Sequence, residues 1–280
     1  MNNLPVISLH GDFYTDYSGI RRLFEFYHTA CEHSNTTIYL DFYHLNWIDA
    51  NLCALLQSIL VKLNEENNLS FSADLNFIKQ KFHVLFRNGF ISSHEPINDE
   101  QDSVIILKSF NSKDKDGFID YVKNELLSHG SMPKFESETH ERIMDSLIEL
   151  YNNIDSHSKS TYPFFVCGQY FPTQKKIVFS MVDLGEGFLP PINIKTKGEV
   201  SNSFESIIWA LEKRHTTRIG TPGGLGLTEL HDYCDKNNGV LQIITGDTYW
   251  SSDLKNTIFD KRTFEKSYVG SIVNLHFTCN

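Results

Sequence analysis

The chain has 280 residues, of which 40% are hydrophobic and 21% are charged, so the composition excludes a disordered chain and a fibrous protein. This length allows two domains of ordinary size. With 25 basic against 35 acidic residues the formal net charge is −10, which argues against a nucleic-acid partner. The five cysteines form no CxxC pair and no metal-binding spacing, which indicates free thiols in a reducing compartment. Since no apolar run approaches the roughly 20 residues of a membrane helix, we expect a cytoplasmic protein without a membrane partner.

The first 110 residues alternate between predicted strands and predicted helices. Strands are expected at residues 4–10, 36–45, 69–75 and 103–110, and helices at residues 17–32, 48–63 and 77–90. The charged stretch 111–117 then lacks apolar residues and reads as a linker. This pattern predicts an α/β domain over residues 1–110.

Residues 111–280 predict a second α/β domain. Helices are expected at residues 118–127, 137–155, 204–212 and 225–237, and strands at residues 163–169, 176–183, 239–245 and 271–278. Three short segments of this domain carry residue types that point to chemistry.

The first segment lies on the predicted helix 137–155 and its continuation. Glu149, Asn153 and His157 are spaced four residues apart, so a carboxylate, an amide and an imidazole share one helical face. Leu147 and Ile148 belong to an apolar stripe that would bury the helix beside them. The polar face is then either solvated or the lining of a cleft.

The second segment follows the apolar strand 176–183. Asp183 ends that strand, and Gly185 and Gly187 come directly after it. A buried carboxylate there can accept a hydrogen bond from an exocyclic amine such as that of adenine, and the glycines let a flat ligand approach the backbone. The alternative is an ordinary glycine turn after a strand.

The third segment opens the predicted helix 225–237 and reads Gly223, Gly224, Leu225, Gly226 and Leu227. Backbone N–H groups at the start of such a helix can converge on a phosphate. The segment lacks the GxxxxGK[ST] pattern and so is not a P-loop. Taken alone, it is weak evidence, because many glycine loops bind nothing.

In this order and spacing, the three segments resemble the GHKL (Bergerat-fold) ATPase superfamily, which includes histidine kinases, gyrase-type topoisomerases and anti-sigma-factor kinases. The resemblance spans about residues 115–278 and implies a two-layer α/β sandwich that binds ATP and Mg²⁺. It implies that Asn153 ligates Mg²⁺, that Glu149 is the catalytic residue and that Asp183 selects adenine. Nucleotide contacts are further implied for His157, Gly185, Gly187, Gly223, Gly224, Leu225, Gly226 and Leu227.

Residues 188–222 correspond in this resemblance to the ATP lid. The lid ends in a stretch similar to that of signalling members, in which Thr217 and Arg218 would contact the nucleotide, with Arg218 at the γ-phosphate. A solvated cationic turn is the alternative for this stretch. Gly270 and Ser271 resemble the Gly-Thr pair that begins the last strand of the family near adenine, with serine in place of threonine.

Residues 5–108 resemble a STAS domain, the fold of anti-anti-sigma factors. Asp49 matches the start of the family's Asp-Ser-Ser-Gly motif, but Ala50, Asn51 and Leu52 replace the rest. Without a hydroxyl group, phosphorylation at the usual position is chemically impossible. We therefore expect a docking or dimerising domain, the alternative being a purely structural layer.

Three functions remain open for the whole chain. The first is a slow ATPase whose lid closure switches a protein interaction, with Glu149 assisting hydrolysis. The second is a Ser/Thr protein kinase that phosphorylates a separate STAS-type partner. The third is a module that binds nucleotide without turnover. Each reading expects ATP and a protein as partners and allows a homodimer.

Overall fold

The computed structural model describes residues 4–92, 99, 102–111, 113–157, 160–212, 226–254 and 261–279, without the side chains of residues 155–157 and 261. The described chain is mixed α/β, as the alternation of strand and helix patterns predicted. No helix in these ranges is both long enough and apolar enough to cross a lipid bilayer.

The N-terminal unit contains two small parallel sheets. β1 (Val6–Ser8), β3 (Thr36–Asp41) and β5 (Leu69–Ser72) form one, and β2 (Gly11–Phe13) pairs with β4 (Leu45–Ile48) in the other. β1 lies within the first expected strand, β2 was not expected, and the second expected strand is divided between β3 and the start of β4. Between β1 and β2 the chain turns at Gly11, whose φ of +76° is readily adopted only by glycine.

The helices of this unit follow the expected order. They are α1 (Tyr17–Ala30), α2 (Cys53–Asn67), α3 (Leu75–Lys81) and α4 (Val84–Arg87), with a 3₁₀ turn (Ala50–Leu52) directly before α2. The Asp16 carboxylate caps α1 by accepting a hydrogen bond from the Gly19 N–H group. The single helix expected at residues 77–90 is replaced by α3 and α4, and the backbone leaves the helical conformation at Phe82.

A larger, five-stranded sheet lies outside the N-terminal unit and is called the second sheet below. It is fully antiparallel and has the strand order β6-β7-β8-β10-β9. Its strands are β6 (Val104–Phe110), β7 (Phe164–Phe171), β8 (Lys176–Asp183), β9 (Val240–Ser251) and β10 (Lys261–Thr278). The strand predicted at residues 103–110 was expected to be the last strand of the first unit. Instead β6 pairs with β7, because its Ile105 and Phe110 side chains pack in the core beneath the second sheet.

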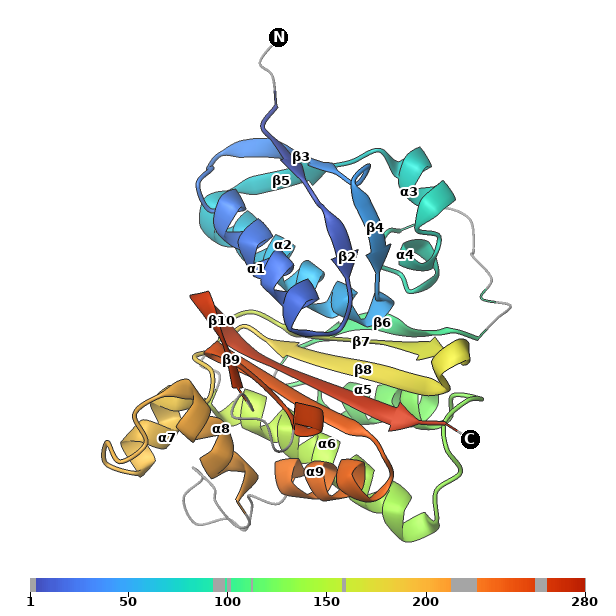
Figure 1. Cartoon of the computed structure of the whole chain (residues 1–280), viewed down its shortest axis with the longest axis vertical. Helices are drawn as coiled ribbons and strands as arrows, with labels where there is room; N and C mark the ends of the chain where they lie inside the picture. Colours follow the sequence, from blue (N-terminus) through green and yellow to red (C-terminus); the bar gives the residue numbers. More distant parts are fainter. Residues whose placement is uncertain are drawn as a thin grey trace.

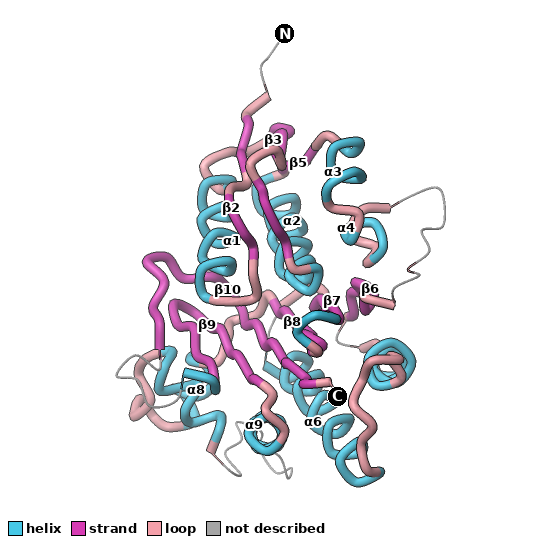
Figure 2. Tube along the Cα trace, turned by 45° about the vertical axis from the view of Figure 1, so that its right-hand side comes forward, coloured by secondary structure: helices cyan, strands magenta, loops and turns pink. Residues whose placement is uncertain are grey.

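Both faces of the second sheet are covered by helices (Figures 1 and 2). One face packs against α5 (Lys115–Tyr121), which continues as a π-helical turn (Val122–Leu127), and against α6 (Ser137–His157), α8 (Ser203–Leu211) and α9 (Gly226–Lys236). Along β8, Phe179 and Met181 face these helices. Val182 faces the opposite way and packs with the N-terminal unit.

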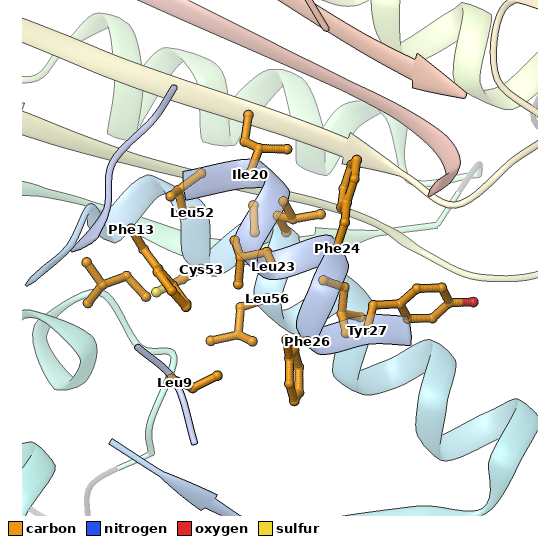
Figure 3. Packing of buried hydrophobic residues seen from close by; sticks show 14 of the residues in the cluster. Leu9, Phe13, Ile20, Leu23, Phe24, Phe26, Tyr27, Leu52, Cys53 and Leu56 are labelled. Carbon is orange, nitrogen blue, oxygen red and sulfur yellow. The ribbon is translucent and has the colours of Figure 1, made fainter. Parts of the chain in front are cut away.

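The opposite face of the second sheet is covered by α1 and α2 of the N-terminal unit. Ile20 and Phe24 of α1 point toward the sheet, while Phe26 points away toward the N-terminal strands (Figure 3). One continuous cluster of buried side chains joins these helices to Val182 on β8 and Ile272 on β10. Helices α1 and α2 thus form a layer between the strands of the N-terminal unit and the second sheet.

Candidate functional site

Glu149 reaches from α6 to the first residue of α9. Its Oε2 atom accepts a hydrogen bond from the Gly226 N–H group at 2.8 Å. A Cβ atom at residue 226 would lie 2.9 Å from the Glu149 Cβ and 3.1 Å from the Ser146 carbonyl oxygen, so only glycine lets the two helices approach this closely. A carboxylate therefore occupies the positive end of α9, where backbone N–H groups favour an anion.

Asn153 lies one helical turn beyond Glu149 on α6 and is half-buried. His157 is the last residue of the same helix, but its side chain lies outside the part that the structure describes. The predicted alignment of Glu149 and Asn153 on one helix thus holds, since a single α-helix runs through both positions.

Asp183 is the last residue of β8 and is only 5% exposed. Burial raises the pKa of its carboxyl group to about 6, while hydrogen bonds from the Gly185 and Leu184 N–H groups and the Ser271 hydroxyl act in the opposite direction. Ser271 lies directly opposite Asp183 in the register of β8 and β10. At neutral pH the group is a buried carboxylate that can accept further hydrogen bonds.

The glycine loop after Asp183 is locked by Thr245, a residue that the sequence did not single out. The Thr245 hydroxyl accepts a hydrogen bond from the Phe188 N–H group at 3.1 Å and donates one to the Gly270 carbonyl oxygen at 3.3 Å. Gly187 has a φ of +74°, and a Cβ atom there would lie 2.5 Å from the Thr245 Oγ1 atom. A residue with a side chain at position 187 would displace the Thr245 hydroxyl, and this explains why glycine occupies the position.

The segment expected as a lid begins with two helices, α7 (Leu189–Lys195) and α8. Only α8 was predicted. At its start, the Ser203 hydroxyl lies 2.5 Å from the position of a Cβ atom on Gly246 of β9, and at its end the Leu211 carbonyl accepts a hydrogen bond from the Thr228 hydroxyl of α9. Helix α8 thus runs from the strand that carries Thr245 to the helix that Gly226 opens.

Five predicted nucleotide-binding residues lie outside the described residues: Thr217, Arg218, Gly223, Gly224 and Leu225. Leu227 is described, and its side chain is buried in the core between α9 and the sheet. Any contact of Leu227 with a phosphate would therefore come from its backbone.

Within the described ranges, no three His, Cys, Asp or Glu side chains converge as a metal site. A bound Mg²⁺ ion commonly keeps several waters and takes one or two protein oxygens together with phosphate oxygens. The Asn153 side chain on α6 offers one amide oxygen of the kind that Mg²⁺ accepts.

On the far face of the sheet, the loop before α2 docks through a closed ring of buried hydrogen bonds. The ring contains Thr15, Asn51, Ser180, Asn274 and Gln242. The Asn51 amide donates to the Thr15 and Ser180 hydroxyls at 2.9 and 2.8 Å, and Ser180 donates to Asn274 at 2.7 Å. Asn274 donates to Gln242 at 3.0 Å, and Gln242 donates to the Thr15 carbonyl at 3.2 Å. Every member is less than 9% exposed, so the ring is shielded from water.

Asp49 supports this ring from the side of the N-terminal unit. It directly precedes the 3₁₀ turn, but its carboxylate makes no capping hydrogen bond there. Instead it accepts hydrogen bonds from the Thr15 N–H group at 2.7 Å, the Thr15 hydroxyl at 2.8 Å and the Trp47 indole N–H group at 2.7 Å. Burial raises the pKa of Asp49, and these hydrogen bonds oppose that shift. The loop 49–52 is therefore a docking element within this chain.

No protein-family model matches the chain, and a search of curated proteins found no match.

Proposed function

We propose that this chain binds ATP with Mg²⁺ in a GHKL-type pocket between α6, α9 and the end of β8. The observation that carries the proposal is the 2.8 Å hydrogen bond between the Glu149 carboxylate and the Gly226 N–H group. It joins the helix with the Glu-x-x-x-Asn pattern to the helix opened by glycines, at the end where a helix attracts phosphate. The bond brings together two segments that are far apart in the sequence.

Asp183 supports the adenine end of the proposal. The site has a buried carboxylate at a strand end, fixed by two backbone N–H groups and by Ser271. Such an acceptor can take a hydrogen bond from the exocyclic amine of adenine. The adjoining glycine loop is held in place by Thr245. A fixed acceptor beside a glycine loop is suited to a flat heterocycle.

In this proposal Asn153 and the phosphate oxygens hold Mg²⁺, which would neutralise charge on the phosphates. Glu149 releases Gly226 when the phosphates arrive and then orients or deprotonates an attacking water molecule. Slow ATP hydrolysis follows, with closure of the lid segment as the switching motion. The STAS-like N-terminal unit would respond to this motion. Asn51 in its loop 49–52 donates a hydrogen bond to Ser180 of β8, the strand that ends in Asp183.

The reaction type is decided by incubating the full chain with γ-labelled ATP and separating free phosphate from labelled protein. We expect free phosphate, formed about 100-fold more slowly by Glu149→Gln, which keeps the acceptor for Gly226 but removes the base. Label on an added STAS-type protein would assign the kinase reaction instead. ATP that stays intact in the wild type, with Glu149→Gln indistinguishable from it, would leave a binding module.

A further inference from the structure

A cavity of about 450 Å³ lies between the start of α1 and strands β8, β9 and β10. Its wall includes Tyr17, Lys176, Gln242, Tyr249, Arg262 and His276. Lys176 is the first residue of β8 and Asp183 is the last. Asp183 lies seven steps along the strand from Lys176, a distance of about 23 Å, so this cavity is distinct from the proposed nucleotide pocket.

The cavity is built by the shape of β9. Gly246 has a φ of +56°, and the strand folds back there so that the Leu241 N–H group donates to the Ser252 hydroxyl at 3.0 Å. Because Tyr249 pairs with Arg262 on β10, the fold-back carries both residues to the cavity that Gln242 lines. The hollow is therefore a consequence of the fold.

Two cations, Lys176 and Arg262, line the cavity together with two carboxylates, Asp16 and Asp253. Among the side chains that the structure describes, Lys176 and Arg262 make no ion pair. The two carboxylates in the wall are already used, since Asp16 accepts from the Gly19 N–H group and Asp253 accepts from the Ser251 hydroxyl at 2.5 Å. An entering anion would meet two cations whose described contacts are with aromatic rings, Lys176 with Phe171 and Arg262 with Tyr17.

His276 lines the cavity as a neutral ring. Its Nε2 atom is closed off from water and has no hydrogen-bond partner. Burial lowers the pKa of the ring to about 3, with the nearby Lys176 charge acting in the same direction, so the imidazole is neutral at physiological pH. A buried polar atom without a partner is costly, but this atom is closed off from the cavity as well as from bulk water, so the ring contributes to the wall and not to ligand binding.

The aromatic residues of the wall supply a surface for the body of a ligand. Tyr17 and Tyr249 meet edge to face with ring centroids 5.9 Å apart, and the Arg262 guanidinium lies 5.3 Å from the Tyr17 ring. Aromatic rings next to a cation are suited to a flat organic group that carries a negative charge.

We propose that this cavity binds a small organic anion, whose carboxylate or phosphate group is held by Lys176 and Arg262 and whose body rests on Tyr17 and Tyr249. Thr15 and Gln242 line the cavity and also belong to the buried ring that docks the N-terminal unit. The ligand therefore binds at the joint between the N-terminal unit and the second sheet.

The test titrates the full chain with phenyl phosphate and, separately, with benzoate, using calorimetry and ligand-observed NMR. We expect one-to-one binding of at least one probe with a dissociation constant of about 1 mM or lower. The comparison of the two probes separates a phosphate ligand from a carboxylate ligand. Lys176→Met and Arg262→Gln should each weaken binding about tenfold or more, because each removes a charge-assisted contact.

Lys79→Met is the matched control, since Lys79 is exposed on α3 and is not part of the cavity wall. Circular dichroism verifies that each variant is folded. The proposal is overturned if neither probe binds, or if binding is the same in Lys176→Met and Arg262→Gln as in the wild type. Binding that is lost only in Asp183→Asn would overturn it too, because the probe would then occupy the nucleotide pocket.

Discussion

Asp183 is a buried carboxyl group whose ionisation lowers the stability of the folded protein. Its pKa is raised from 3.8 to about 6, so the folded protein binds more protons than the unfolded chain between these pH values. Stability therefore falls as the pH rises through this window, and the full cost is present above it. The shift corresponds to at most about 3 kcal/mol.

We therefore expect Asp183→Asn to raise the free energy of unfolding at pH 7.5 and to have little effect near pH 4. The gain will be less than the limit above, because the amide faces three hydrogen-bond donors with fewer acceptors. The same variant should lose ATP binding. Urea denaturation at a series of pH values measures the first effect, and Asp145→Asn, at an exposed position on α6, is the control. A stability difference that does not change with pH would contradict this account of the carboxylate.

At this scale the sequence predicted the residues whose position follows from local pattern. Glu149 and Asn153 share a helix, and Asp183 ends an apolar strand. Thr245 was missed, because its hydroxyl gains a role only through the pairing of β9 with β10 and the return of the glycine loop to it. A lone threonine on an apolar strand carries no such signal.

The elements meet through hydrogen bonds as well as through apolar packing. The ring through Asn51, Ser180 and Asn274 closes only when the loop before α2 lies on the second sheet. Such a ring fixes one docking geometry, because any shift leaves buried donors without acceptors.

Ser180→Ala should lower the free energy of unfolding by about 1–3 kcal/mol, because it leaves one Asn51 N–H group and the Asn274 carbonyl oxygen unpaired. Chemical denaturation measures the loss. The control is Ser70→Ala, at an exposed position on β5, which should change stability by less than about 0.5 kcal/mol. Equal effects of the two substitutions would mean that the ring contributes nothing beyond an ordinary surface contact.

The bounds of helices and strands were predictable where the hydrophobic periodicity was strong. The predictions were wrong where contacts between distant segments set the bounds. The strand 176–183 and the helix 203–211 match the expectation closely. β10 starts ten residues earlier than expected, at Lys261, because its first residues pair with the folded-back end of β9. The pairing of β6 with β7 was equally hidden, since the strand pattern of residues 103–110 does not say which sheet the strand joins.

At the scale of the whole molecule, helices α1 and α2 pack between the strands of the N-terminal unit and the second sheet. Phe24 of α1 is 2% exposed, stacks on Tyr268 of β10 with ring centroids 4.8 Å apart, and meets Phe264 edge to face. The α/β class was predictable from alternating strands and helices. The docking of the N-terminal unit on the second sheet was not, because apolar helix faces indicate burial without naming the surface that covers them.

Phe24→Ala should lower the free energy of unfolding by about 3–5 kcal/mol and leave a single thermal transition. The cavity opens between the two units, so both should lose stability together. Hydrogen exchange measures this, with equal loss of protection expected in α2 and in β10. A separate, earlier transition of the N-terminal unit would show that the two units fold independently.

The most direct measurement of the proposed function is calorimetric titration of the full chain with ATP, with Mg²⁺ and with EDTA. The account predicts that Mg²⁺ strengthens binding in the wild type and in Asn152→Ala, whose residue neighbours Asn153 on α6. Asn153→Ala should lose this dependence, because the Mg²⁺ ligand is gone. Unchanged affinity and unchanged Mg²⁺ dependence in Asn153→Ala would contradict it.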